Sequence, residues 1–436
     1  MVFFVMFNNI IVGLKNRVEF LIQRLFYKIA PIFLRYLSPQ TVGKFVGKIS
    51  RVRSCNFDIL KKSIFAIEAG QNTKDLKELT KIETFNIIYV NQYWLSIISI
   101  IYLNKNLRFA NHFYENDDIP EKEVELLLLS LESFFKEIER RYNKIGCFLS
   151  PNFEQGFTAV LHRYVQRKKL GIVAFHYEHS TLPMAIRSTE NSYKEYSCKS
   201  LERIKILLWH EEAKKRLVDA NYASSKNIVI SGPPRFNSWI DIIKTPIQEK
   251  KYITLLSFPG SDYFAPFTYE DIVLAFKKAA SVHKGYNFVI KCKDGWHISQ
   301  TMRILNNNVG NITLTADMDM VDLLSQSKII VGFNSLSFLE ALLAQSYLIL
   351  PYWGDSKHDP YLLQVDPQDP EAQAIIDVAN SREHFAEILE QRIAGEGYQG
   401  DMKKRIEYLN KYIYFDENNK SIDIFEKVFL ENYEQN

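Results

Sequence analysis

The pattern of hydrophobic and polar residues divides most of the chain into short apolar runs and longer amphipathic segments. From about residue 121 the two kinds of segment alternate, which is typical of strands that alternate with helices in parallel sheets. A first series of predicted strands spans residues 144–149, 170–175, 204–209 and 227–231. A second series spans residues 252–258, 287–292, 312–315, 328–333 and 347–350. Helices are predicted at 121–142, 153–169, 211–220, 269–283, 298–305, 318–325 and 337–345.

The two series predict two doubly wound α/β domains in tandem. Between them, GPPRFNSW at 232–239 contains two consecutive prolines, which cannot continue a strand inside a sheet. This stretch therefore predicts an exit from the first sheet into a linker that ends at 244–251. Before residue 121 the pattern predicts only an apolar core strand or helix at 95–103. The predicted organisation is a basic N-terminal segment at 1–60, domains at 61–240 and 250–415, and a C-terminal helix at 416–436.

The N-terminal segment has the composition of an interfacial membrane anchor. Its cations at positions 17, 24, 28 and 35 fall within a narrow stripe of one helix face, apolar side chains cover much of the rest, and Glu19 is the only acid before Asp58. Residues 1–14 are apolar but shorter than the roughly 20 residues that span a bilayer, and they lack the features of a signal peptide. The alternative is that the apolar face packs on the protein's own first domain while the cations face solvent.

Composition and charge bear on whether the protein binds nucleic acid or a metal ion. The chain has 436 residues, is 47% hydrophobic and carries a net charge of only +3, so nothing in the bulk charge favours a nucleic-acid partner. The four cysteines are far apart and have no metal-ligand spacing, which favours free thiols in a reducing compartment and predicts no metal site. In the stretch ADMDM, the two aspartates are predicted to begin a helix rather than to bind a metal.

Polar residues at the predicted strand ends carry the candidate chemistry, because ligands of open α/β sheets bind at the carboxyl ends of the strands. Glu178 and His179 follow the predicted strand at 170–175 and are the candidate catalytic acid/base residues. Adjacent residues of an extended chain point in opposite directions, so we expect one of the two to face the cleft. The alternative is a loop with a surface acid and a packed histidine.

Three further strand ends carry residues that suit a phosphate or a diphosphate. A glycine permits a turn, an arginine donates two parallel hydrogen bonds, a Gly-Ser pair exposes backbone N–H groups, and two lysines neutralise charge. These residues are Gly232 with Arg235, Gly260 with Ser261, and Lys291 with Lys293, whose alternation places both on one face of an extended strand. The alternatives are a rigid linker whose arginine pairs with a local acid, a chance Gly-Ser pair and an ordinary charged strand end.

The stretch IVGFNSLSFLEALL at 330–343 is the most informative strand end. A buried strand gives way to a helix through three polar residues, Asn334, Ser335 and Ser337. One residue suffices to cap a helix, so three at its N-terminus favour an anion-binding site there. Glu340 follows as the single acid on the apolar helix, where its carboxylate can accept hydrogen bonds from two vicinal hydroxyls of a ribose. Mere capping by the three polar residues is the alternative.

These motifs resemble the GT-B glycosyltransferases of the bacterial surface-polysaccharide group, which includes capsule Kdo transferases and CDP-glycerol glycerophosphotransferases. The resemblance spans about 145–415 and rests on three stretches: EHSTLP at 178–183, GPPRF at 232–236 and the long segment 318–353. It implies a nucleotide-activated donor held by the second domain, an acceptor approached from the first, and catalysis without a bound metal. The chain departs from the group at KCKDGWH, where CMP-sugar users carry His-Pro, and at Pro233 and Asn237.

The expected function is therefore transfer of a sugar from a nucleotide-activated donor to a surface glycan such as capsule, O-antigen or lipopolysaccharide. The resemblance implies no cofactor, a glycan or lipid-linked glycan as acceptor, and a place on the cytoplasmic face of an anionic membrane. Three alternatives remain open: transfer of glycerol phosphate or another polyol phosphate, epimerisation of a free UDP-sugar, and a non-catalytic, membrane-associated assembly component.

Deletion of residues 1–36 tests the predicted anchor. Loss of five cations and an apolar helix face is expected to weaken binding to anionic vesicles about tenfold or more. Vesicle flotation measures the binding, and circular dichroism checks that the shortened protein remains folded. Equal binding by a folded, shortened protein contradicts the prediction.

Overall fold

The computed structural model describes most of the chain from residue 34 onward. The described residues are 34, 36–54, 57–69, 72–103, 121–151, 156–175, 204–219, 223–244, 250–258, 265–308, 310–333, 335–357, 365–397 and 400–434. Residues 1–33 of the predicted anchor lie outside them, as do Glu178, His179, Gly260, Ser261 and Asn334.

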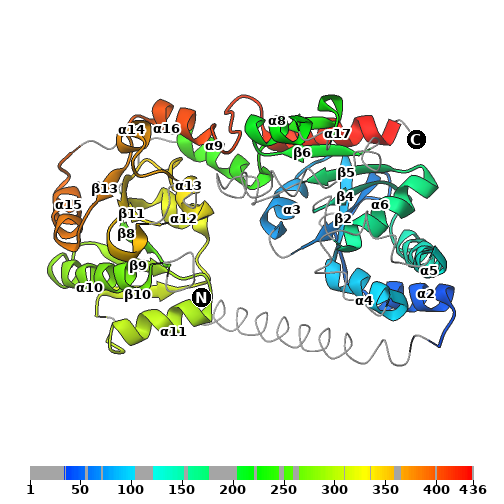
Figure 1. The fold of residues 1–436 in the computed structure, drawn as a ribbon, viewed down its shortest axis with the longest axis horizontal. Helices are drawn as coiled ribbons and strands as arrows, with labels where there is room; N and C mark the ends of the chain where they lie inside the picture. The colour runs from blue at the N-terminus through cyan, green and yellow to red at the C-terminus, as the bar shows by residue number, and fades with distance from the viewer. Residues whose placement is uncertain are drawn as a thin grey trace.

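The first domain is built on a seven-stranded sheet with the order β1-β3-β2-β4-β5-β6-β7 (Figure 1). Its strands are β1 (Val52–Ser54), β2 (Lys62–Glu68), β3 (Phe85–Asn91), β4 (Ile145–Ser150), β5 (Gly171–Phe175), β6 (Lys205–Leu208) and β7 (Ile228–Ile230). Neighbouring strands are parallel except β1, which pairs antiparallel with β3 at the sheet edge. The sequence analysis predicted none of the strands before residue 121, although β2 lies well inside the sheet.

Helices cover both faces of this sheet, which explains why its strands are continuously apolar. In β2, Phe65 and Ile67 pack into the core on one face, and Ile64 and Ala66 pack into the core on the other. The first face is covered by α2 (Pro39–Ile49), α4 (Gln92–Leu103), α5 (Glu121–Glu139), α6 (Gly156–Lys168) and α8 (Glu211–Asp219). The second face is covered by α3 (Thr73–Leu79) and α17 (Ser421–Glu434).

The second domain has a six-stranded parallel sheet with the order β10-β9-β8-β11-β12-β13. Its strands are β8 (Tyr252–Leu256), β9 (Asn287–Lys291), β10 (Ile312–Thr315), β11 (Ser327–Val331), β12 (Tyr347–Pro351) and β13 (Asp377–Ala379). Its helices are α10 (Pro266–Val282), α11 (Gly295–Ile304), α12 (Met320–Ser325), α13 (Leu336–Ala341), α14 (Pro370–Gln373), α15 (Arg382–Ala394) and α16 (Met402–Leu409). Two doubly wound sheets in tandem confirm the predicted GT-B fold class.

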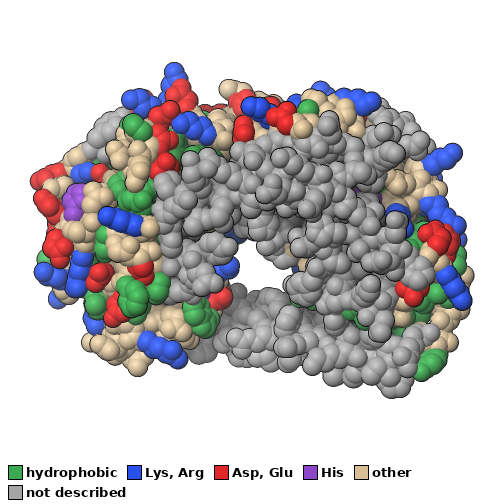
Figure 2. All heavy atoms as spheres, viewed as in Figure 1, with side chains coloured by type: hydrophobic (Ala, Val, Ile, Leu, Met, Phe, Trp, Pro, Cys, Tyr) green, Lys and Arg blue, Asp and Glu red, His purple; other side chains and the backbone are tan. Residues whose placement is uncertain are grey.

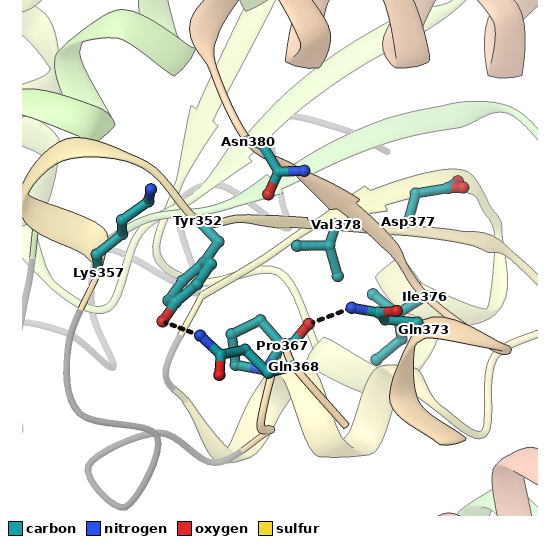
Figure 3. Close-up of a pocket in the computed structure, with 9 residues that line it drawn as sticks. All are labelled: Tyr352, Lys357, Pro367, Gln368, Gln373, Ile376, Asp377, Val378 and Asn380. Atoms are coloured by element: carbon teal, nitrogen blue, oxygen red, sulfur yellow. Dashed lines mark hydrogen bonds between the residues drawn. The ribbon is translucent and has the colours of Figure 1, made fainter. Parts of the chain in front are cut away.

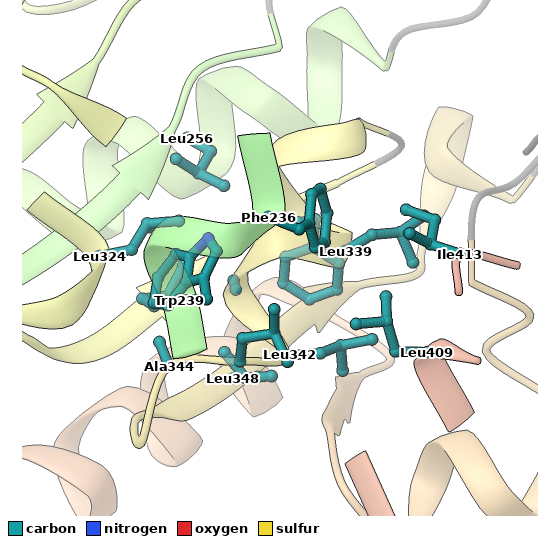
Figure 4. Packing of buried hydrophobic residues seen from close by; sticks show 14 of the residues in the cluster. Phe236, Trp239, Leu256, Leu324, Leu339, Leu342, Ala344, Leu348, Leu409 and Ile413 are labelled. Carbon is teal, nitrogen blue, oxygen red and sulfur yellow. The ribbon is translucent and has the colours of Figure 1, made fainter. Parts of the chain in front are cut away.

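The chain passes between the domains twice. After the short 3-10 turn η5 (Pro234–Phe236), helix α9 (Asn237–Lys244) packs into the second core, where Phe236 and Trp239 lie among leucines from several elements of the second domain (Figure 4). At the other end of the chain, α17 returns to the first sheet, and the rings of Phe425 and Phe175 are 5.0 Å apart. The predicted linker at 232–251 is thus in large part a helix of the second core.

The two connections touch at Gly232. Its φ of 63° lies in the left-handed region, and a Cβ at this position would lie 2.2 Å from the carbonyl oxygen of Tyr414. The Ser421 hydroxyl donates to the Gly232 carbonyl over 3.0 Å. The backbone N–H of Tyr414 donates to the carbonyl of Trp209, with 2.5 Å between the two atoms. Gly232 therefore has a structural reason to be a glycine, separate from any contact with a ligand.

Two general expectations can be compared with the described residues. Within them, no helix combines the length and the apolar character needed to cross a membrane. Cys147 and Cys292 are buried free thiols, and burial raises the pKa of Cys147 to about 12. The Cys147 thiol is therefore protonated at neutral pH and has little nucleophilic character.

Replacing Gly232 with alanine tests whether the two interdomain connections need a glycine where they touch. The left-handed backbone and the contact with Tyr414 together are expected to cost about 2–5 kcal/mol of unfolding free energy. Thermal or urea unfolding measures the loss. Gly285→Ala is the matched control, because no atom lies within 4 Å of the added Cβ there. Equal unfolding free energies of Gly232→Ala and Gly285→Ala would show that the backbone accommodates a side chain at residue 232 without loss of stability.

Candidate functional site

Side chains of both domains come together where the carboxyl ends of β9 and β11 approach α3. Lys74, in the first turn of α3, is close enough to Lys291 and Glu340 to affect the pKa of each. Asp75 and Arg235 also act on Glu340. We call Lys74, Asp75, Arg235, Lys291 and Glu340 the cleft cluster. It combines charged groups from α3, the interdomain linker, the end of β9 and helix α13.

Glu340 is the most unusual member of the cleft cluster. Its side chain is 4% exposed, and within the described residues no hydrogen-bond donor contacts its carboxylate. Burial raises the pKa of this carboxyl group, while Lys74 and Arg235 act in the opposite direction. A buried carboxylate without a hydrogen-bond donor is costly in free energy, so this position suits an acid that receives its donors from a ligand.

The polar residues before Glu340 have separate roles. Ser335 is the N-cap of α13, and its hydroxyl accepts a hydrogen bond from the N–H of Phe338 over 3.3 Å. Ser335 therefore acts as a helix cap, which is the alternative to a ligand-binding role. The Ser337 hydroxyl is half-buried and makes no hydrogen bond within the described part of the chain. The Phe338 ring packs directly against the backbone at Gly332, where a Cβ would lie 2.3 Å from it.

The two lysines after β9 differ in environment. Lys291 is half-buried, and its ammonium group donates to the carbonyl of Ala316 over 2.6 Å. Burial lowers its pKa, and the neighbouring Lys74 lowers it further. Strand β9 ends at Lys291, so the predicted alternation does not extend to Lys293, which is exposed just before Asp294, the N-cap of α11. The structure places Lys291 in the cleft cluster but not Lys293.

Arg235 is held by an acid from the other end of the first domain. Its guanidinium contacts both carboxylate oxygens of Asp75, with 2.8 Å between Nη2 and Oδ2 and 3.1 Å between Nε and Oδ1. It also lies 5.4 Å from the ring of Trp209. This matches the alternative of an arginine paired with an acid, although the acid is 160 positions earlier in the chain. Arg235 thereby positions α3 and Lys74 beside the second domain.

Two residues of this region were not among the predicted site residues. Lys74 belongs to α3, for which the apolar pattern gave no signal. His297 lies in the first turn of α11, is 7% exposed, and its Nδ1 is 2.9 Å from the hydroxyl of Ser257 at the end of β8. Burial lowers the pKa of His297, so its ring is neutral at pH 7. The stretch KCKDGWH lacks the His-Pro of CMP-sugar users, but its His297 still places an imidazole after the strand that carries Lys291.

A polar pocket of about 440 Å³ opens at the edge of the second sheet, beside β13 (Figure 3). Gln368 and Tyr352 approach each other in it, with 3.5 Å between the amide nitrogen and the phenol oxygen. Lys357 and Asn380 complete its upper rim in Figure 3. Amides, a phenol and an ammonium group suit a ligand rich in hydroxyls.

A second pocket, of about 460 Å³, lies at the domain crossing. It is lined by His210 and Glu211 of the first domain and by residues 414–418 of the returning chain. The imidazole of His210 is buried and accepts a hydrogen bond from the N–H of Ala213 over 3.2 Å. This pocket adjoins the connection between the domains and not the cleft cluster.

The described residues contain no group of three or more His, Cys, Asp or Glu side chains that could hold a metal ion. In the stretch ADMDM, Asp319 is the N-cap of α12 and accepts hydrogen bonds from the N–H groups of Val321 and Asp322. The prediction that this stretch begins a helix is confirmed.

Comparison with known proteins gives relatives in fold only. No family model and no curated protein matches the sequence. The UDP-GlcNAc 2-epimerase from Neisseria meningitidis bound to UDP-GlcNAc is 14% identical with a TM-score of 0.45, and the match covers 85% of this chain and 100% of that one. A putative UDP-N-acetylglucosamine 2-epimerase from Listeria monocytogenes is 11% identical with a TM-score of 0.49, covering 86% and 98%. A glycosyltransferase from Rickettsia africae is 14% identical with a TM-score of 0.44, covering 86% and 98%.

The raised pKa of Glu340 predicts a pH-dependent effect of Glu340→Gln on stability. The folded protein keeps this proton at pH values where the unfolded chain has lost it. The stability that the proton contributes is complete below the ordinary glutamic acid pKa and is lost as the pH rises through the raised folded value. Glutamine cannot ionise. The variant without ligand is therefore expected to melt a few degrees above the wild type near pH 8, and by a smaller margin near pH 5.

Differential scanning fluorimetry across this pH range provides the measurement. Glu387→Gln is the matched control, because Glu387 is exposed on α15 and makes no ion pair within the described residues. A Glu340→Gln margin that stays constant with pH would show that the carboxyl group keeps its ordinary pKa.

Proposed function

We propose that this protein is a glycosyltransferase that takes a sugar from a nucleotide-activated donor bound in the interdomain cleft. The observation that carries the proposal is the buried carboxylate of Glu340, which lacks a hydrogen-bond donor in the described residues and is influenced by the charges of Lys74 and Arg235. Lys74 also acts on Lys291, at the end of β9. An acid that needs donors, beside cations from both domains, suits a ligand with vicinal hydroxyls and a diphosphate.

The donor nucleotide is assigned to the second domain. The Glu340 carboxylate accepts hydrogen bonds from the two ribose hydroxyls, and Ser337 offers a free hydroxyl one turn earlier on α13. Lys291 and Lys74 neutralise the diphosphate, which gains negative charge as the sugar leaves. Helix α13 has only six residues, so we assign most of this stabilisation to the lysines and less to the helix dipole.

The reaction at the sugar requires a base on the acceptor side. The acceptor hydroxyl loses its proton to Glu178 or His179, its oxygen forms a bond to the anomeric carbon, and the bond from that carbon to the diphosphate breaks. The nucleotide leaves with the electron pair of that bond. In this proposal the charge is neutralised by side chains alone, so no cofactor and no metal takes part.

The acceptor is proposed to be a surface glycan, such as capsule, O-antigen or lipopolysaccharide, or its lipid-linked precursor. The motifs at 178–183, 232–236 and 318–353 support this choice through their resemblance to surface-polysaccharide enzymes. A basic amphipathic segment at 1–36 would keep the enzyme on the inner face of the membrane, where a lipid-linked acceptor is available.

A thermal-shift panel of CMP, CDP, UDP and GDP is the first test. At least one nucleotide is expected to raise the melting temperature of the wild type, because it binds only the folded state. Glu340→Ala is expected to weaken that nucleotide about tenfold, through loss of hydrogen bonds to a charged group. In transfer assays, Glu178→Ala or His179→Ala is expected to lower kcat about 10²–10⁴-fold for whichever residue is the base.

The controls separate the alternatives. Glu387→Ala, on the surface of α15, should bind nucleotide and transfer sugar as the wild type does. Turnover of CDP-glycerol without turnover of any sugar nucleotide would identify a polyol-phosphate transferase. Conversion of a UDP-sugar without an acceptor would identify an epimerase. Absence of a shift with all four nucleotides would favour a non-catalytic component, and full activity in all three site variants would refute the site assignment.

A further inference from the structure

The outer face of α2 carries apolar side chains that the fold leaves in solvent. The opposite face of the helix is packed tightly against α5: Val42 and Val46 are fully buried, and a Cβ on Gly43 would lie 1.9 Å from the carbonyl oxygen of Ser130. The helix is therefore fixed in its rotation about its own axis. Two exposed apolar side chains lie on the helix, Phe45 at 40% and Ile49 at 37%, and a third, Leu37 at 43%, lies just before it.

A turn near the C-terminal end of α2 exposes two more large apolar side chains. Ile59 is 72% exposed and Leu60 is 90% exposed. The turn is well held: Asp58 accepts a hydrogen bond from the N–H of Leu60 over 2.9 Å, and the Asp58 N–H donates to the side chain of Asn86 over 2.9 Å. An apolar tip on a hydrogen-bonded turn is presented to solvent in a defined conformation.

The end of α5 connects these two features. The guanidinium of Arg141 donates to the carbonyl of Gly47 in the last turn of α2, and the Asn143 amide donates to the carbonyl of Ile59. The exposed end of α2 and the apolar turn therefore flank the same end of α5. We call the side chains of Leu37, Phe45, Ile49, Ile59 and Leu60 the apolar ridge.

Positive charge surrounds the apolar ridge. Residues 36–62 contain six Lys and Arg residues and one acid, Asp58. Arg53 pairs with Glu68, but Lys44, Lys48 and Lys61 form no ion pair within the described residues. Lys44 and Lys48 alternate with Phe45 and Ile49 on the exposed side of α2. Hydrophobic and Lys/Arg side chains both reach the surface at the right-hand end of Figure 2, where Figure 1 places α2.

We propose that the apolar ridge and its lysines dock the folded first domain onto an anionic lipid bilayer. Exposed apolar side chains gain free energy by leaving water, and the lysines beside them are attracted to lipid phosphates. A second protein copy would place the same lysines against one another, which disfavours self-association through this face. This inference deepens the membrane-associated part of the proposed function and assigns contact to the folded domain in addition to the N-terminal segment.

Docking by α2 also sets an orientation. Helix α2 belongs to the layer on one face of the first sheet, whereas α3 and its Lys74 lie on the other face. If α2 rests on a bilayer, the first sheet therefore lies between the lipid and α3, and the cleft cluster faces away from the lipid.

Vesicle flotation with the full-length chain tests the proposal. The vesicles are phosphatidylcholine with a minority of phosphatidylglycerol, and pure phosphatidylcholine serves for comparison. The double variant Phe45→Ser, Ile49→Ser is expected to bind the anionic vesicles about tenfold more weakly. The double variant Lys44→Gln, Lys48→Gln is expected to lose about fivefold per lysine, and the difference should shrink in high salt.

Val282→Ser is the matched control, because Val282 is a 66% exposed apolar residue on α10 of the second domain. It should bind vesicles as the wild type does, and all variants should keep the wild-type melting temperature and nucleotide shift. These two readouts separate a failure of docking from a failure of the proposed glycosyltransferase site. Wild-type vesicle binding by both double variants would overturn the proposal. So would a wild-type dimer that Phe45→Ser, Ile49→Ser converts to a monomer without loss of vesicle binding.

Discussion

The buried ion pair between Asp75 and Arg235 is the contact on which the candidate site depends. Asp75 is almost completely buried, with 1% of its side chain exposed, and Arg235 bonds to both of its carboxylate oxygens. The pair joins α3 to the linker whose next residue, Phe236, packs into the second core. Removing either partner would leave a buried charge without compensation. The pair therefore fixes where Lys74 stands relative to Glu340.

The same region contains a buried group, Glu340, that lowers the stability of the fold. Glu340 is surrounded by apolar neighbours on α13, yet it carries a carboxyl group whose pKa burial raises. In a protein selected only for stability, a leucine or alanine at this position would avoid the desolvation penalty. A buried acid retained within reach of the charges of Lys74 and Arg235 is more readily understood as a binding group than as a packing group, and pKa values perturbed in this way gather at functional sites.

The first domain combines two different tasks on opposite faces of one sheet. The face with α3 and α17 meets the interdomain connections, where Gly232 allows the two crossings to touch. The other face carries α2 and α5, whose close packing turns the apolar ridge outward. Because β2 contributes to the cores on both faces, the layer that carries the apolar ridge and the layer that carries α3 pack against the same strand.

The sequence by itself determined the fold class, because the alternation of apolar runs and amphipathic segments reflects which residues of each strand or helix are buried. It also located Lys291 at a strand end, Glu340 in the helix that follows a strand, and Asp319 at the start of a helix. It did not find β2, β3 or α3, although β2 and β3 have seven residues each. Only the tertiary structure decided that Arg235 pairs with Asp75, that Lys74 belongs to the cleft cluster and that Lys293 is exposed beyond the end of β9. Those outcomes depend on contacts between segments up to 160 positions apart, which no local pattern of residues contains.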